Sequence, residues 1–195
     1  MLASARADTL FQFTQDTCTG TCGTGPFGTV QLTQLTPLSV RVLTTLGPNS
    51  RFAGTGAGEA LTFSISGAKT VTIDSLTTNF AVGPGNIKVN GALGTFEYSV
   101  SCTTCQGGSA SNPAGPLSFR VSSTSGLLLS DFIANSKGFY FASDIVGNNG
   151  NTGNVGSQAG SYYAPTPEPA TLCMTGAAAV LLALLRRRLK GEASV

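Results

Sequence analysis

The sequence predicts an all-β fold: an antiparallel β-sandwich or jelly-roll-like domain. Short segments in which apolar and polar residues alternate recur along the chain, and Gly, Pro and Asn separate them. Charged residues make up only 10% of the chain, and 25 of its 195 residues are Gly. This composition is typical of exported β-proteins and differs from that of disordered chains. Strands of this kind have one dry and one wet face, so two sheets are expected to pack together.

The clearest expected strand is 95–101, where Phe96, Tyr98 and Val100 face one way and polar residues face the other. The full set of expected strands is 9–14, 28–35, 38–44, 60–65, 70–76, 95–101, 117–122 and a strand through Phe139 and Phe141. Segment 126–135 fits either a short helix or a further strand. Asn90-Gly91 is expected to close a tight hairpin after 87–89.

The net charge of +2 comes from the chain ends. Between residues 8 and 164 there are six Lys/Arg against seven Asp/Glu. This part of the chain has no basic stripe, so the sequence gives no electrostatic basis for binding nucleic acid, and we expect no nucleic-acid partner. The sequence also contains no His, which excludes Ser-His-Asp and Cys-His catalysis.

No phosphate-binding loop, nucleophile elbow or dinucleotide motif occurs in the sequence. Five acidic residues are scattered through the body, and their separation predicts solvated side chains rather than a catalytic pair: Glu59, Asp74, Glu97, Asp131 and Asp144. Asp131 or Asp144 could bind calcium together with backbone carbonyls, but no pattern in the sequence indicates a calcium site. We therefore expect neither an enzyme nor a cofactor.

Four of the five cysteines form two close pairs, Cys18 with Cys22 and Cys102 with Cys105. In an exported protein such pairs predict disulfides. Two local bridges and two long-range bridges are both compatible with the sequence. Zinc binding by the four thiols and free thiols are the alternatives. Cys173 lies in an apolar run and is interpreted as a small apolar residue.

The N-terminal residues 1–7 end in Ala5-Arg6-Ala7, which has the form of a signal-peptidase site. We interpret this segment as the remnant of a signal peptide whose leader lies upstream of Met1; an accidental Ala-x-Ala in a mature start is the alternative. The β-domain is expected to cover 8–146. The Gly/Asn-rich stretch 147–166 is expected to be a flexible linker.

The C-terminal tail has three successive parts. Pro167, Glu168 and Pro169 form a short polar motif, and an apolar run from Ala170 to Leu185 follows. The run is expected to be a membrane-anchoring helix through Ala170, Leu172, Ala179, Val180, Leu181, Leu182, Leu184 and Leu185. Four basic residues then form a cytoplasmic stop: Arg186, Arg187, Arg188 and Lys190. At about 1.5 Å per residue the run is shorter than a ~30 Å hydrocarbon core, which favours a transient anchor.

In order and spacing this tail, 167–190, resembles the PEP-CTERM sorting signal of exported proteins from Gram-negative bacteria. The resemblance implies that a membrane protease-transpeptidase, exosortase, recognises Pro167, Glu168 and Pro169 and removes the helix. An ordinary single-pass anchor is the alternative. Segments 131–135 and 138–141 also resemble parts of other PEP-CTERM proteins, which implies no activity.

Taken together, the sequence predicts an exported structural or binding protein of the cell surface or extracellular matrix. It would be anchored transiently in the inner membrane with its C-terminus in the cytoplasm. Exosortase, the inner membrane and extracellular polysaccharide are the expected partners. A carbohydrate-binding or adhesin module is the main alternative, and a carboxylate-dependent hydrolase is the third.

Overall fold

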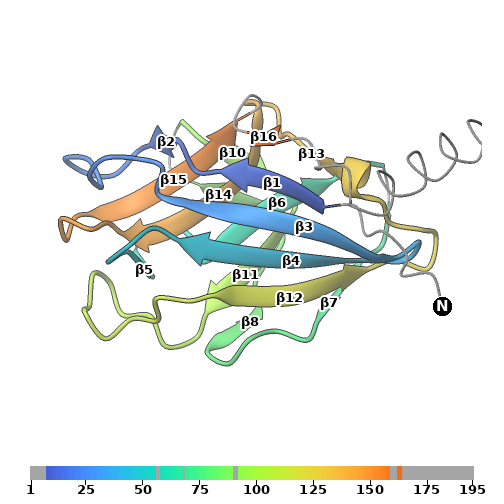
Figure 1. Cartoon of the computed structure of the whole chain (residues 1–195), viewed down its shortest axis with the longest axis horizontal. Coiled ribbons are helices and arrows are strands. Elements are labelled where there is room, and N and C mark those ends of the chain that lie inside the picture. Colours follow the sequence, from blue (N-terminus) through green and yellow to red (C-terminus); the bar gives the residue numbers. More distant parts are fainter. Residues whose placement is uncertain (1–7, 56–57, 68, 90–91, 159–161, 164–195) are drawn as a thin grey trace, which may run out of the picture.

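The computed structural model describes residues 8–55, 58–67, 69–89, 92–158 and 162–163. These residues fold into two packed antiparallel sheets (Figure 1). The strand order of the first sheet is β16 (Tyr162–Tyr163), β1 (Asp8–Gln12), β3 (Gly28–Thr36), β4 (Ser39–Leu46), β12 (Leu117–Ser122) and β7 (Thr72–Asp74). The all-β, antiparallel, sandwich-like fold predicted from the sequence is thus confirmed.

The second sheet contains most of the remaining strands. Its order is β2 (Gln15–Asp16), β15 (Thr152–Gln158), β14 (Phe139–Val146), β6 (Leu61–Ile65), β11 (Tyr98–Cys102) and β8 (Phe80–Val82). Two short strands extend it: β5 (Arg51–Phe52) pairs with β14, and β13 (Phe132–Ile133) pairs with β6. A separate hairpin joins β9 (Ile87–Val89) to β10 (Gly94–Phe96).

The main core lies between the two sheets and is built from their inward-facing side chains. Val30, Val42 and Phe119 of the first sheet share one buried cluster with Phe63 and Phe141 of the second. Alternation of side chains along each strand produces this arrangement, because every second residue faces the opposite sheet. Burial of apolar area at ~25 cal/mol per Å² is the main force that holds the sheets together.

A second, smaller core covers the outer face of β14. The β9–β10 hairpin contributes Val89 and Phe96 to it, and β14 contributes Phe139 and Ala142. Strand β14 is therefore covered on both faces, which explains why seven of its eight residues are buried. Asp144 is two residues beyond Ala142, so the alternation puts its side chain on the same outer face.

The expected strands are present, with several differences in detail. The segment 95–101 is split at Glu97, because Phe96 packs in the small core whereas Val100 packs in the main core. Segment 126–135 combines both expectations: a short 3₁₀ helix, η1 (Leu129–Asp131), leads directly into β13. The hairpin predicted after 87–89 is present, since Val89 pairs with Gly94; Asn90 and Gly91, which were expected to close it, lie outside the described residues.

The expectation of a flexible linker over 147–166 is wrong for much of that stretch. Residues 152–158 form β15, which pairs with β14 along its whole length. Its small residues are required by close packing: a Cβ at Gly153 would lie 2.6 Å from the Cα of Cys18, and one at Gly156 would lie 2.7 Å from a methyl of Leu93. The sequence shows no apolar pattern here because the backbone of β15 packs closely against its neighbours. Such packing requires glycine at these positions and leaves no room for large apolar side chains.

The last described strand, β16, also continues the domain beyond residue 146. It pairs antiparallel with β1, Tyr162 opposite Phe11 and Tyr163 opposite Leu10. The chain in β16 therefore runs toward the end of the sandwich where β1 begins at Asp8. Figure 1 shows that the β3–β4 turn lies at this same end.

Candidate functional site: the disulfide-bearing end of the sandwich

Three loops gather at the end of the sandwich opposite to the start of β1 (Figure 1). They are residues 17–26 after β2, residues 103–116 after β11, and residues 147–151 between β14 and β15. Both disulfides, Cys18–Cys22 and Cys102–Cys105, belong to this disulfide-bearing end. The predicted disulfides are thus confirmed, and of the two pairing patterns left open the local one is correct.

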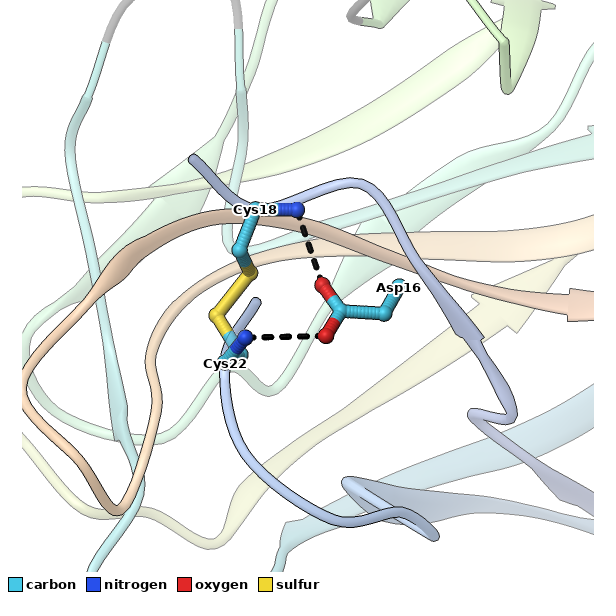
Figure 2. A group of neighbouring side chains, drawn as sticks. All are labelled: Asp16, Cys18 and Cys22. Atoms are coloured by element: carbon cyan, nitrogen blue, oxygen red, sulfur yellow. Dashed lines mark hydrogen bonds between the residues drawn. A yellow bond between two sulfur atoms is a disulfide. The ribbon is translucent and has the colours of Figure 1, made fainter. Parts of the chain in front are cut away.

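The Asp16 side chain bridges the two ends of the first disulfide loop, Cys18 and Cys22. Its two carboxylate oxygens each accept one backbone hydrogen bond, from Cys18 N–H at 2.8 Å and from Cys22 N–H at 2.8 Å (Figure 2). Among the described residues, Asp16, Cys18 and Cys22 are the group whose ligand atoms lie close enough for a metal ion. Because both sulfurs are bonded to each other and both carboxylate oxygens accept N–H groups, this cluster stabilises a loop and does not fit a zinc site.

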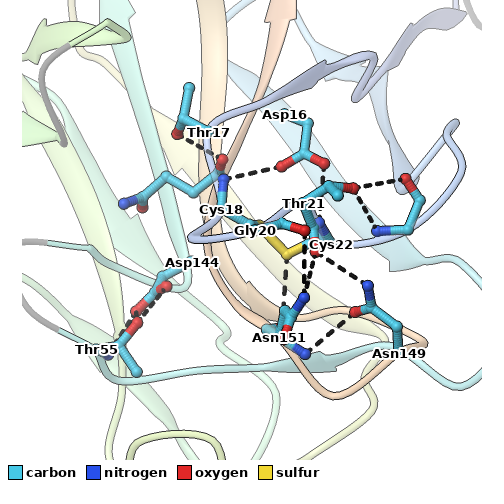
Figure 3. Close-up of a disulfide and its surroundings, with 12 residues drawn as sticks. Asp16, Thr17, Cys18, Gly20, Thr21, Cys22, Thr55, Asp144, Asn149 and Asn151 are labelled. Atoms are coloured by element: carbon cyan, nitrogen blue, oxygen red, sulfur yellow. Dashed lines mark hydrogen bonds between the residues drawn. A yellow bond between two sulfur atoms is a disulfide. The ribbon is translucent and has the colours of Figure 1, made fainter.

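The 147–151 turn fastens the same loop to the sheet. Asn149 and Asn151 each donate a side-chain amide hydrogen bond to the carbonyl of Thr21, at 3.0 and 2.8 Å (Figure 3). Thr21 has a φ of 74°, a left-handed conformation that is uncommon for a β-branched residue. The Asn side chains bind the carbonyl that this conformation turns toward them, so hydrogen bonds join the loop to the turn.

The second disulfide loop is ordered by Asn112, which is 1% exposed. Its side-chain oxygen accepts the N–H of Gln106 at 2.9 Å, and its amide donates to the carbonyl of Gly107 at 3.0 Å. Arg51 donates to the carbonyl of Asn112 at 3.0 Å and so connects the loop to β5. Both disulfide loops are therefore built from internal hydrogen bonds as well as from their covalent bridges.

Asp144 is the most unusual titratable group near this end. Its side chain has 0% exposure and accepts hydrogen bonds from the N–H of Thr55 at 2.5 Å and from the Thr55 hydroxyl at 2.8 Å (Figure 3). Burial raises the pKa of Asp144 to about 6; the bonds from Thr55 oppose this change, and the charge of Glu59 adds to it. Because the carboxyl has no exposed surface, it and Glu59 do not present two acids to a substrate in this arrangement.

The other acids of the body form structural contacts. Asp74 forms a two-point ion pair with Arg120, and the hydrogen bond from Arg120 holds the pKa of Asp74 below its ordinary value. Burial raises the pKa of Asp131, but hydrogen bonds from Leu128 N–H, Lys69 and Ser66 outweigh it, and the pKa is lowered. Glu97 accepts the N–H of Ile65 at 3.1 Å. The expectation that these side chains are simply solvated is therefore incorrect for several of them.

The solvent-facing surface of the disulfide-bearing end is polar and uncharged. Most of its exposed side chains are hydroxyls and amides: Thr19, Thr21, Thr24, Thr103, Thr104, Gln106, Ser111, Asn148 and Asn149. The exposed apolar residues of these loops are small or cyclic, namely Pro26, Ala110, Ala114 and Pro116. In the described part of the chain the large apolar residues that are exposed are Leu38, Val82, Leu128 and Ile133, all of them aliphatic. Recognition at this end would therefore depend on hydrogen bonds rather than on aromatic stacking.

Several predicted site residues lie outside the described part of the chain. They are the Pro167-Glu168-Pro169 motif, the expected anchor 170–185 and the basic residues 186–190, and the expected signal-peptide remnant 1–7 is outside it too. Within the described residues, no helix has both the length and the apolar character needed to cross a bilayer. In the comparisons with known proteins, no family model, no curated protein and no solved structure matches this chain.

The sequence interpretation missed Asp16, Thr55, Asn112, Asn151 and Asn154. Asp16 gave a local signal, because an acid two residues before the first Cys of a short loop can accept the loop's N–H groups. Thr55 and Asn154 gave none, because each meets its partner, Asp144 or Gly58, only through the pairing of strands distant in the sequence.

Proposed function

We propose that the protein is a structural or binding component of the cell surface or extracellular matrix that is displayed from a C-terminal membrane tail. The supporting observation is the direction of the chain. Strand β16 runs toward the end of the sandwich where β1 begins, and both disulfide loops lie at the opposite end. A tail that continues from β16 would hold the first end next to the membrane and present the disulfide-bearing end outward.

Two further observations support the proposal, the first on location and the second on the kind of partner. The disulfides are favoured in oxidising compartments. The exposed residues of the disulfide-bearing end carry no charge, which suits neither nucleic acid nor a strongly charged partner. In this proposal Pro167, Glu168 and Pro169 are the exosortase recognition motif, and 170–185 form the helix that exosortase removes.

Mass spectrometry of the mature protein from its native host tests the proposal. We expect a chain that ends near Pro167, and an intact C-terminus in the variant in which Pro167, Glu168 and Pro169 are all replaced by Ala. As a matched control, Pro113 in the described domain is replaced, and processing near Pro167 should then be unchanged. A mature native chain that still contains Arg186–Arg188 would refute processing, and recovery of the protein solely from the cytosol would refute export.

The second candidate is a carbohydrate-binding or adhesin module. The uncharged hydroxyls and amides of the disulfide-bearing end favour it, since these groups match sugar hydroxyls as donors and acceptors. Sedimentation of the protein with polysaccharide from its host, compared with the triple variant Thr103→Ala, Gln106→Ala and Asn148→Ala, distinguishes this role. Unchanged co-sedimentation of the triple variant would favour a purely structural role.

A further inference from the structure

Asp144 and Asn154 are directly opposite each other on neighbouring strands. They are Cα partners in the pairing of β14 with β15, so their side chains share one face of the sheet. Both are buried, with exposures of 0% and 4%. Gly58 covers both: a Cβ at Gly58 would lie 2.5 Å from the Cβ of Asp144 and 2.7 Å from the side-chain oxygen Oδ1 of Asn154.

One buried hydrogen-bond acceptor at this place has no donor in the described part of the chain. Thr55 supplies its N–H and its hydroxyl to the Asp144 carboxylate. The Oδ1 atom of Asn154 is buried and has no hydrogen-bond partner among the described residues. Glu59, one residue after Gly58, lies beside Asp144, because its backbone carbonyl accepts the N–H of Asp144 at 2.9 Å. The negative charge of Glu59 disfavours the charge on Asp144 and so helps to raise the pKa of Asp144. A buried acceptor without a donor destabilises a fold, and so does a buried carboxylate whose charge no cation compensates.

No cationic side chain compensates this charge within the described residues. The two ion pairs found there join Lys69 to Asp131 and Arg120 to Asp74. Arg51, on β5, donates to the carbonyl of Asn112 in the second disulfide loop. A positive charge that satisfies Asp144, Asn154 and Glu59 together must therefore come from outside this part of the chain.

We propose that Asp144, Asn154 and Glu59 bind a divalent cation of the calcium type at the disulfide-bearing end. The available ligands are carboxylate and amide oxygens, which are the ligands of hard cations, and no His or free Cys is present among them. Backbone carbonyls and water complete the six to eight ligands that calcium takes. Thr55 is a positioning residue, because its two hydrogen bonds fix the orientation of the Asp144 carboxylate.

A bound calcium ion would fasten β14, β15 and the segment around Gly58 to one another. The first disulfide loop lies directly on this unit, since Thr17 donates to the carbonyl of Asn154 at 2.7 Å and Gly153 packs on Cys18. The cation would therefore stiffen the outward surface. Dissociation constants of extracellular calcium modules, about 10⁻⁴–10⁻³ M, are the expected range.

Thermal unfolding and isothermal titration of the full disulfide-bonded chain in detergent test the proposal at pH 7.5. We expect the Tm to rise on addition of 5 mM CaCl₂ after EDTA treatment, and the titration to show one site. The rise in Tm and the binding signal should both be lost in Asp144→Asn. In Glu59→Gln the affinity for calcium should fall at least tenfold. Asp74→Asn, which removes an acid of the Arg120 ion pair, is the matched control and should keep the full effect.

Two results would overturn the proposal. One is an unchanged Tm in 5 mM CaCl₂ for the native protein. The other is an equal rise in Asp144→Asn and the native protein, which would mean that calcium acts elsewhere. If Asp144→Asn fails to fold, Asn154→Leu, which removes the unpartnered oxygen at similar volume, replaces it, and retained calcium binding in that variant would count against the site.

Discussion

The Thr55 hydroxyl lies 2.8 Å from Oδ1 and 2.9 Å from Oδ2 of Asp144, and the backbone N–H of the same residue lies 2.5 Å from Oδ2. One residue thus supplies two donors to a carboxylate with no exposed surface. A hydrogen bond to a charged group stabilises a fold more than a neutral one does. This contact therefore connects the segment after β5 to the centre of the second sheet.

Thr55→Val removes the hydroxyl and keeps the backbone N–H and nearly the same volume. We expect the free energy of unfolding to fall by about 1–3 kcal/mol, because the buried carboxylate loses a donor. Urea unfolding followed by circular dichroism measures the change. Thr103→Val, at an exposed position, is the matched control and should change stability by less than about 0.5 kcal/mol. Equal effects of the two substitutions would show that the Thr55 hydroxyl contributes nothing specific.

Asp144 also predicts an unusual dependence of stability on pH. Its pKa is raised from 3.8 to about 6 in the folded protein, chiefly by burial. The unfolded chain therefore releases this proton first, and the free energy of unfolding should fall as pH rises from about 4 to about 6, by roughly 2–3 kcal/mol. Above pH 6 this contribution is constant. The measurement requires EDTA, so that protons alone neutralise the carboxyl.

Asp74 and Asp131 act in the opposite direction, because their pKa values are lowered in the fold. Their contribution is present above about pH 4 and is lost as pH falls further. We therefore expect maximal stability between about pH 4 and 5. Asp144→Asn should remove the decline between pH 4 and 6 and keep the loss below pH 4. A native profile that is flat from pH 4 to 6 would contradict the raised pKa.

Alternation was enough to predict most of the sandwich. Segments such as 28–35 and 117–122 carry branched and aromatic residues at every second position, and they form β3 and β12 with only small changes in their bounds. The signal failed at β15, where Gly153 and Gly156 pack against the backbone of Cys18 and the side chain of Leu93. A strand that is buried through close backbone contact has little apolar side chain for a pattern to reveal.

The candidate site was less predictable than the fold. The cysteine pairs indicated disulfides, but the acids that shape this end were interpreted as solvated. Asp144 contacts Thr55, 89 residues earlier in the sequence, only because β5 and β6 both pair with β14, along the edge that β15 leaves free. Contacts of this kind depend on the order of the strands in the sheet, which the residue pattern within one strand does not encode.

Asp16 and the Cys18–Cys22 bridge stabilise one loop, so their contributions should be coupled. Asp16→Asn replaces one of two acceptor oxygens by an amide that faces an N–H, and we expect a loss of about 1.5–3 kcal/mol. In the Cys18→Ser, Cys22→Ser background the same change should cost much less, because the loop is already free to open. Unfolding of all four chains in urea gives the coupling energy. Strictly additive losses would show that Asp16 acts independently of the bridge.

The turn between β14 and β15 provides a test of whether this region belongs to the folded domain. A Cβ at Gly147 would lie 2.2 Å from the carbonyl oxygen of Cys22, and this atom cannot rotate away because it is backbone next to a disulfide. We expect Gly147→Ala to lower the free energy of unfolding by about 3 kcal/mol or more through this overlap. At Gly150, in the same turn, a Cβ would meet nothing within 4 Å, but φ is +84°. Gly150→Ala should therefore cost only about 1–2 kcal/mol, the penalty of a left-handed L-residue. Thermal and urea unfolding of the two variants measures the difference. Equally small losses would mean that the turn does not pack on the disulfide loop in solution, whereas the structure requires Gly147→Ala to be clearly the more harmful change.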